Sequence, residues 1–192
     1  STISNNIDFS INSGATVDFG SSVLNGSSGA FTLNSNAKIV TANTNGFYST
    51  GNNGSIQVGG VRTYSSTADY EFKGTATGIF TTSTNPQVRN FIVNNTTGNV
   101  VMSQPMTVNG VLTLTAGLLT TTTTNLLTIS ATGSASAATN ASFVNGPIAK
   151  VFAAPLTGFT FPVGKSGTGF RNIGVTAPSG ASTFRAEFFR AL

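Results

Sequence analysis

The chain carries short pairs of hydrophobic residues, each pair separated by one residue and bounded nearby by Gly, Asn or Ser. Such pairs with period 2 are typical of half-buried β-strands. They are Phe9/Ile11, Val17/Phe19, Phe31/Leu33, Ile56/Val58, Tyr70/Phe72, Phe91/Val93, Met106/Val108, Leu112/Leu114 and Leu127/Ile129. No segment shows the sustained apolar stripe of an amphipathic helix. The pattern therefore predicts an all-β protein.

The pairs recur at a nearly constant interval. Phe31 follows Phe9 by 22 residues, whereas Phe91 follows Tyr70 by 21 and Leu112 follows Phe91 by 21. A fixed period of this length is typical of stacked coils, in which each repeat buries its apolar face against its neighbours. We predict a parallel β-solenoid of 20–22-residue coils, seven or so in number, in which Tyr70, Phe91 and Leu112 form one inward column.

Two features complicate this prediction. The region 34–69 fits the period poorly, which indicates a longer loop or an irregular coil. Asn-Gly steps favour positive φ and predict corners between strands, but the same dipeptide is also a strong hairpin signal. An antiparallel β-sandwich therefore remains the alternative fold. The steps lie at Asn25-Gly26, Asn45-Gly46, Asn53-Gly54, Asn109-Gly110 and Asn145-Gly146.

Composition excludes several classes of protein. The chain has no His, Cys or Trp, so histidine bases, catalytic triads that need His, zinc fingers and disulfide scaffolds are ruled out. Only 7% of its 192 residues are charged, but 39% are hydrophobic and 15 are Phe, which favours a folded domain over a polar linker. No apolar run is long enough for a membrane span. We expect no cofactor and no metal site.

The C-terminal part differs in charge from the rest. Residues 150–192 hold five basic residues and one acidic residue, which accounts for the whole net charge of +4. We therefore divide the chain into a solenoid over residues 1–146 and, over 147–192, an antiparallel β unit or the start of a further domain. The strand-like run before Leu192 indicates that the chain is a fragment of a longer protein.

Two motifs suggest enzyme chemistry at first sight. The segment Gly158–Ser166 resembles a phosphate-binding loop, but its glycines lie one residue too far apart, and Pro162 removes an amide donor. A strand that ends in a Gly-Lys turn explains it better. Asp69 and Glu71 could form a pair of catalytic carboxylates, as in glycosidases. Acids two residues apart are more simply read as a solvated outer strand face beside Arg62 or Lys73, so we expect no catalytic residues.

Two further patterns suggest binding. The tail places Arg directly after Phe at Phe170-Arg171, Phe184-Arg185 and Phe189-Arg190, a pattern that could bind an anionic polymer. Strand alternation, with Phe184, Ala186 and Phe188 pointing inward, explains the same pattern without a ligand. Threonines at 113, 115 and 120–124 could form a flat array for ice or crystalline polysaccharide. Their spacing does not repeat on several coils, so a solvated β-face is the preferred interpretation.

Several stretches resemble the β-strand-repeat regions of large cell-surface proteins of Bacteroidetes. They are Val17–Leu33, Thr41–Gly46, Val108–Gly117, Asn125–Ile129, Phe143–Pro147 and Phe159–Lys165. The resemblance implies a secreted, adhesin-like protein, often exported by the type IX system, with no catalytic residues to carry over. The sorting domain usual at the C-terminus of such proteins is not present, which leaves the export route open.

We therefore expect a non-enzymatic, extracellular or cell-surface module with a structural or adhesive role. Low charge and open strand edges also predict self-association into filaments, since unpaired edges recruit further strands. The expected partners are further copies of the chain or extracellular polysaccharide, and neither nucleic acid nor a membrane. The alternative function is a carbohydrate- or ice-binding solenoid domain.

Overall fold

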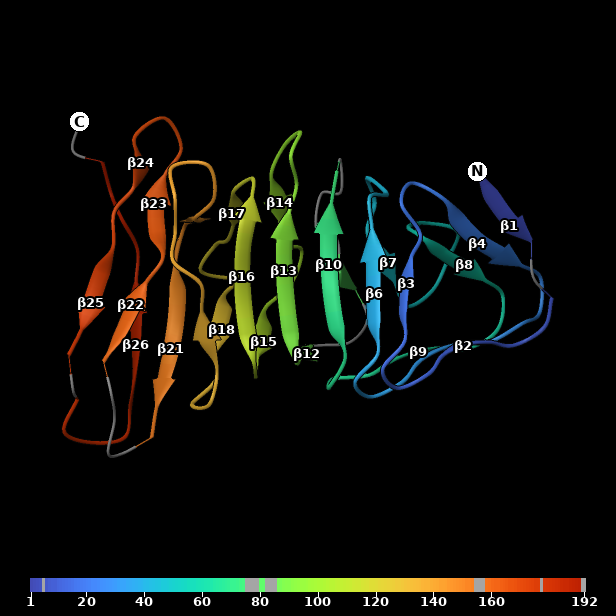
Figure 1. Cartoon of the computed structure of the whole chain (residues 1–192), viewed down its shortest axis with the longest axis horizontal. Helices are drawn as coiled ribbons and strands as arrows, with labels where there is room; N and C mark the ends of the chain where they lie inside the picture. Colours follow the sequence, from blue (N-terminus) through green and yellow to red (C-terminus); the bar gives the residue numbers. More distant parts are fainter. Residues whose placement is uncertain (5, 75–79, 82–85, 154–157, 177, 191–192) are drawn as a thin grey trace.

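The computed structural model of the chain describes all residues except 5, 75–79, 82–85, 154–157, 177 and 191–192. Its described residues form 26 short strands and no helix. The strands wind into about seven coils, which follow one another along the long axis from the N-terminal to the C-terminal end (Figure 1). The prediction of an all-β solenoid is confirmed.

Each coil contributes three or four strands. The first three coils contain β1 (Thr2–Ser4), β2 (Phe9–Ile11), β3 (Thr16–Asp18); β4 (Val23–Gly26), β5 (Phe31–Leu33), β6 (Lys38–Thr41), β7 (Phe47–Tyr48); and β8 (Ile56–Val58), β9 (Arg62–Tyr64), β10 (Asp69–Lys73), β11 (Phe80–Thr81). The next three contain β12 (Gln87–Val88), β13 (Asn90–Asn94), β14 (Val100–Val101); β15 (Met106–Val108), β16 (Val111–Ala116), β17 (Leu119–Thr120); and β18 (Leu127–Ile129), β19 (Ser134–Ala135), β20 (Val144–Asn145). The last coil and the strands after it are β21 (Ile148–Phe152), β22 (Phe159–Phe161), β23 (Val163–Lys165), β24 (Gly169–Phe170), β25 (Ile173–Val175) and β26 (Ser182–Ala186).

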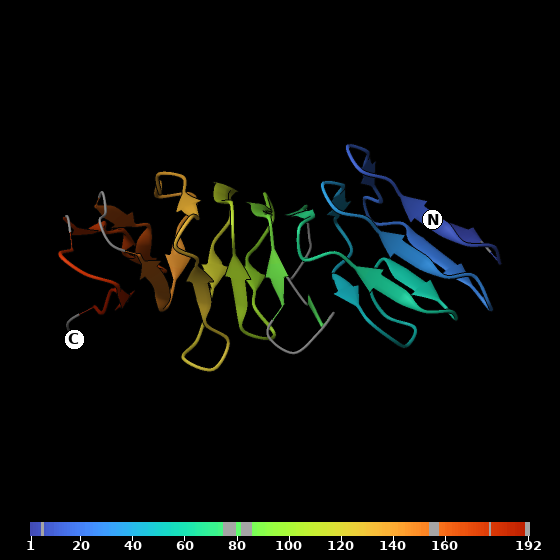
Figure 2. The same cartoon turned by 90° about the horizontal axis from the view of Figure 1, so that it is seen from below.

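Equivalent strands of successive coils pair in parallel. The longest sheet has six strands in the order β19-β16-β13-β10-β6-β3 and runs along one side of the rod (Figure 1). Sheets β1-β4-β8 and β2-β5-β9 complete the first three coils. Sheets β12-β15-β18-β21-β26 and β14-β17-β20-β23-β24 complete the later ones, and Figure 2 shows the same stack from below. The smaller sheets are β7-β11 and β22-β25.

The register of these pairs confirms the period read from the sequence. Phe9 pairs with Phe31, and Tyr70 pairs with Phe91, which in turn pairs with Leu112. All of these residues except Phe9 are at most 1% exposed, and they belong to one continuous hydrophobic core. A side chain on one coil is thus covered by its equivalents about 21 residues before and after it.

The irregular region is a longer coil. Ile39 pairs with Tyr70, an interval of 31 residues, so this coil has about ten residues more than its neighbours. The extra length contains β7, whose Phe47 is fully buried and contacts Phe72 with a ring-centroid distance of 5.4 Å. The poor fit of residues 34–69 to the period therefore reflects an insertion that adds an aromatic side chain to the core.

The parallel stack ends in an antiparallel layer. β26 pairs with β21, β25 with β22 and β24 with β23, all in antiparallel orientation. β21 itself pairs in parallel with β18, and β23 with β20, so parallel stacking continues past residue 146 before the chain reverses. These three antiparallel strand pairs lie at one end of the rod, so the alternative of an antiparallel sandwich is wrong.

The corners of the coils are only partly those predicted. Gly46, Gly54 and Gly146 have the expected positive φ. Gly110 lies in the predicted corner between β15 and β16 but has no positive φ. Gly26 lies within β4, so the predicted corner is wrong at that step. Gly60 shows a different requirement, because a Cβ there would lie 2.6 Å from the carbonyl oxygen of Gly29 on the neighbouring coil.

Candidate functional site

The outer face of the six-stranded sheet gathers most of the charged residues of the first four coils. On β10, Tyr70 and Phe72 point into the core, so that Asp69, Glu71 and Lys73 alternate to the outside. Neighbouring strands add Asp18, Lys38 and Asn90 to the same face, and Arg89, in the bend before β13, contacts Asp69 there. We call this set of residues the charged face, and we consider it first because it contains Asp69 and Glu71.

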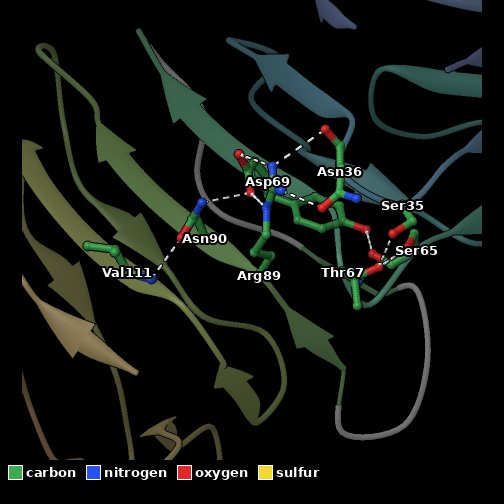
Figure 3. A network of polar contacts seen from close by, with 9 residues as sticks. Ser35, Asn36, Ser65, Thr67, Asp69, Arg89, Asn90 and Val111 are labelled. Carbon is green, nitrogen blue, oxygen red and sulfur yellow. Dashed lines mark hydrogen bonds and ion pairs between the residues drawn. The ribbon is translucent and has the colours of Figure 1, made fainter. Parts of the chain in front are cut away.

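Asp69 is held by two residues of the next coil. Arg89 donates through Nε to Asp69 Oδ1 at 2.7 Å and through Nη2 to Oδ2 at 2.9 Å, a bidentate pair, as Figure 3 shows. Asn90 donates to the same carboxylate at 2.9 Å, while its own Oδ1 accepts from the Val111 amide at 2.7 Å. The Asp69 side chain is 14% exposed. Its oxygens are thus engaged in linking consecutive coils.

Arg89 also reaches back across two coils. Its Nη1 donates to Asn36 Oδ1 at 2.5 Å, and Asn36 has a φ of 60°, the left-handed conformation that Asn tolerates. The Asn36 amide donates to the Thr67 carbonyl at 3.1 Å, and the hydroxyl of Thr67 contacts those of Ser35 and Ser65. This network joins the turns of successive coils at one corner of the rod (Figure 3).

The other acids of the charged face are also paired across coils. Glu71 forms an ion pair with Lys38 at 2.7 Å and accepts from Asn94 at 3.0 Å. Lys73 pairs with Asp18, which lies two strands away. Val40 pairs with Asp18 on one neighbouring strand and with Glu71 on the other. It does not belong to the hydrophobic core cluster, yet it is only 4% exposed. The paired side chains around it therefore form a covered layer.

The protonation of Glu71 follows from these contacts. Burial raises the pKa of Glu71, but hydrogen bonds from Asn94 and Lys38 outweigh burial and leave the pKa below its usual value. Burial likewise raises the pKa of Asp18, and its contacts with Lys73 and the Gly20 amide bring that pKa below the ordinary one. A general acid needs the opposite shift, towards higher pKa. The arrangement favours permanently charged, paired carboxylates.

Asp69 and Glu71 lie on an outer strand face beside Lys73, as expected, but their side chains are only 14% and 12% exposed, so the prediction of a solvated face is wrong. Lys73 is on the same strand, but Arg62 lies on β9, in another sheet. Its guanidinium donates to the carbonyl oxygens of Tyr48, Gly51 and Val58 instead. Arg62 thus holds the inserted segment of the long coil against the adjacent strands.

The segment that resembled a phosphate-binding loop forms strands. From Gly158 onward it contains β22 and β23, and β23 ends at Lys165 before a turn leads into the antiparallel β24. No helix follows it among the residues that the structure describes, whereas a phosphate-binding loop opens a helix. The interpretation as a strand followed by a turn is confirmed.

The threonine tracts do not form one flat array. Thr113 lies half-buried on the outer side of β16, but Thr121 is buried and donates to the Pro147 carbonyl at 2.7 Å. Thr122 accepts from the amide of Asn125 in a turn. The tract over residues 120–124 therefore leaves the sheet, and an extended ice-binding surface is not supported there.

The Phe-Arg tail follows strand alternation in part. Ala186 is 8% exposed and Phe188 packs against the core, as expected. Phe184 pairs with Lys150, which pairs with the buried Ile129, so Phe184 is on the inner side of its sheet as expected. It is nevertheless 40% exposed, and its ring contacts Phe152 at a centroid distance of 5.5 Å. β26 is the last strand of its sheet, and one side of Phe184 is therefore left uncovered.

Lys150 has a role that the sequence did not indicate. It is 5% exposed, and its Nζ donates to the carbonyl oxygens of Ser130, Ala131 and Gly133 at 2.6, 3.1 and 2.7 Å. The ring centre of Phe159 lies 5.4 Å from the same ammonium group. Burial lowers the pKa of Lys150. The ammonium group ties the turn of the sixth coil to the last coil.

No family model, curated protein or solved structure matches the chain. Among the described residues there is no group of three or more acidic side chains that could hold a metal ion. No described segment forms a helix long and apolar enough to cross a membrane. The interpretation of function therefore depends on the geometry of the coils.

Proposed function

We propose that the chain is a non-enzymatic structural module, a rigid β-solenoid spacer that holds groups at a fixed distance in an extracellular or cell-surface assembly. The observation that carries this proposal is the direction of the ion pairs. Lys38–Glu71 and Arg89–Asp69 each join consecutive coils, and Lys73–Asp18 joins coils two apart. The charged face therefore stabilises the stacking of the coils along the long axis of the rod.

The aromatic core supports the same role. Ring contacts run from Phe9 to Phe31, from Phe31 to Tyr64 and from Phe72 to Phe91, each joining successive coils. Because each coil is covered by its neighbours, bending the rod would open these contacts and the backbone ladders together. An extended scaffold of this kind suits adhesion, and the resemblance to Bacteroidetes surface proteins is the basis for proposing secretion.

Single-molecule stretching tests the spacer role. The chain held by its two ends should resist force as one stiff body and then lose coils stepwise, since each coil packs mainly against its neighbours. The variant Arg89→Met, which removes the bidentate pair with Asp69, should lower the force of the first step. A chain that lengthens smoothly without steps would contradict the proposal.

We propose in addition that the isolated chain assembles end to end through its first coil. β1, β2 and β3 each stand at the edge of their sheet, and β1 is exposed throughout, with Ile3 50% exposed. Edge strands of this kind recruit further strands unless charges protect them. The occupant of this edge would be the antiparallel layer of a second copy.

Electron microscopy over a range of concentrations tests the assembly. Wild-type rods should lengthen into filaments as concentration rises, and Ile3→Lys should keep them single because a charge on an edge strand opposes pairing. The matched control is Val101→Lys, at a residue that is 47% exposed but lies away from the first coil. Uniform single rods at every concentration would refute assembly and leave the spacer role untouched.

A further inference from the structure

An Asn-Gly step can modify itself without an enzyme, and the chain contains five of them. Hydroxide removes the amide proton of the glycine, whose nitrogen then attacks the side-chain carbonyl carbon of the asparagine. A succinimide ring forms, and ammonia leaves with a proton taken from water. A second water molecule opens the ring at either carbonyl group, which gives aspartate or isoaspartate. The attack requires a glycine amide without a hydrogen-bond partner, an unrestrained asparagine side chain and a backbone that can rotate.

Two of the five steps have a glycine amide that is already hydrogen-bonded. The Gly46 amide donates to the Asn43 carbonyl at 2.9 Å, and the Gly110 amide donates to the Arg89 carbonyl at 2.7 Å. Each of these hydrogen bonds must break before the nitrogen can attack, which should slow the reaction about threefold to tenfold. Both steps are therefore protected by the folded structure.

Two more steps are held in other ways. Gly26 lies within β4, where it pairs with Val58 of β8, so its backbone is part of a strand ladder and cannot rotate freely. Asn145 accepts through its Oδ1 from the Ser166 amide at 3.1 Å, which restrains the side chain that would have to move. The fold thus opposes the reaction at these two steps as well.

The step Asn53-Gly54 has none of these restraints. Asn53 is exposed, and its side chain forms no hydrogen bond with any residue that the structure describes. The Gly54 amide likewise has no acceptor among the described residues. The glycine itself is required by the fold, because its φ is 72° and a Cβ there would lie 2.4 Å from the carbonyl oxygen of Gly46. The residue that permits the attack is therefore fixed by packing.

We infer that Asn53 is the residue at which the folded chain deamidates first. The isoaspartyl product routes the main chain through the side chain and so adds one carbon to the backbone. This carbon enters between two fixed points: the Gly51 carbonyl accepts from Arg62 at 2.6 Å, and the hydroxyl groups of Ser55 and Thr41 lie 2.6 Å apart in the core. The modification should therefore loosen the inserted segment of the long coil. This inference is independent of the spacer role, because it concerns a covalent change of the chain itself.

Peptide mass spectrometry after incubation of the full chain in mildly alkaline buffer tests the inference. Trypsin cleaves after Lys38 and after Arg62, so one peptide carries both Asn45 and Asn53, and fragmentation assigns the modified residue. In the folded chain Asn53 should deamidate about threefold to tenfold faster than Asn45, because only the Gly46 amide is hydrogen-bonded. In urea the two rates should become similar, since the sequence of the reacting step is the same.

Two variants connect the modification to the long coil. Asn53→Gln removes the reactive side chain at an exposed position, so its melting temperature should stay constant during incubation while that of the wild type falls. Asn45→Gln is the matched control and should change with time as the wild type does. The inference is overturned if Asn45 reacts as fast as Asn53 in the folded chain, or if Asn53 stays intact when folded but reacts in urea. An unchanged melting temperature of the modified wild type would contradict the loosening of the long coil.

Discussion

Replacing one inward residue and its outward neighbour tests the stacked core. Phe91 is 1% exposed, pairs with Tyr70 and Leu112, and lies with its ring centroid 5.6 Å from that of Phe72. Phe91→Ala should therefore lower the free energy of unfolding by about 3–5 kcal/mol. Ile92 is half-buried on the outer face, and Ile92→Ala should cost only about 1 kcal/mol.

Urea denaturation followed by far-ultraviolet circular dichroism measures both changes. With a slope of about 2 kcal/mol per molar urea, Phe91→Ala should lower the midpoint by about 1.5–2.5 M and Ile92→Ala by about 0.5 M. The two residues are adjacent and differ mainly in the face to which they point. Equal shifts for both variants, or a larger shift for Ile92→Ala, would refute the assignment of the inward column.

Three further predictions concern single contacts. The pKa of Glu71 is lowered in the folded chain, so its stabilising effect is present above the ordinary carboxyl pKa of about 4.3 and is lost as pH falls through the lowered value. When the free energy of unfolding is measured at decreasing pH, Glu71→Gln should make this decline less steep. An unchanged pH profile would contradict the pairing. Lys150→Met leaves three carbonyl groups without their donor and should lower the free energy of unfolding by about 2–4 kcal/mol. The amide hydrogen of Gly133 should then exchange faster. Unchanged exchange would show that the ammonium group does not hold this turn. Gly60→Ala should lower the melting temperature because its Cβ would lie 2.6 Å from the Gly29 carbonyl oxygen, whereas Gly180→Ala, where nothing lies within 4 Å, should have little effect.

The repeat itself could be predicted because single apolar residues recur at the same position of each coil. The inward position of each strand must be apolar in every coil, so Tyr70, Phe91 and Leu112 recur at the coil length and reveal the register. The insertion between Ile39 and Tyr70 appeared as a gap in this pattern, but the sequence could not show that β7 fills it with Phe47. A side chain from an insertion has no period of its own.

Arg89 and Asn90 contact Asp69 at about the coil length, but the ion pairs that cross the long coil could not be predicted, because their spacing differs from the period. Lys38 and Glu71 are 33 residues apart and Lys73 and Asp18 are 55 apart, so neither pair repeats the coil length. The role of Lys150 depends on three backbone carbonyl groups, which carry no sequence signal. Composition indicates that such charges are few, but only the winding of the chain decides what they contact.

Inserting whole coils tests the central claim most directly. The chain has no Cys, so Ser10→Cys and Thr183→Cys, at exposed positions near the two ends, give unique sites for spin labels. The distance between the labels is then measured by pulsed electron resonance before and after two extra copies of residues 106–126 are inserted after residue 126. A stack of coils predicts a distance about 10 Å longer with an equally narrow distribution, since each coil adds about 4.8 Å. An unchanged distance, or a broad distribution, would contradict the rigid solenoid.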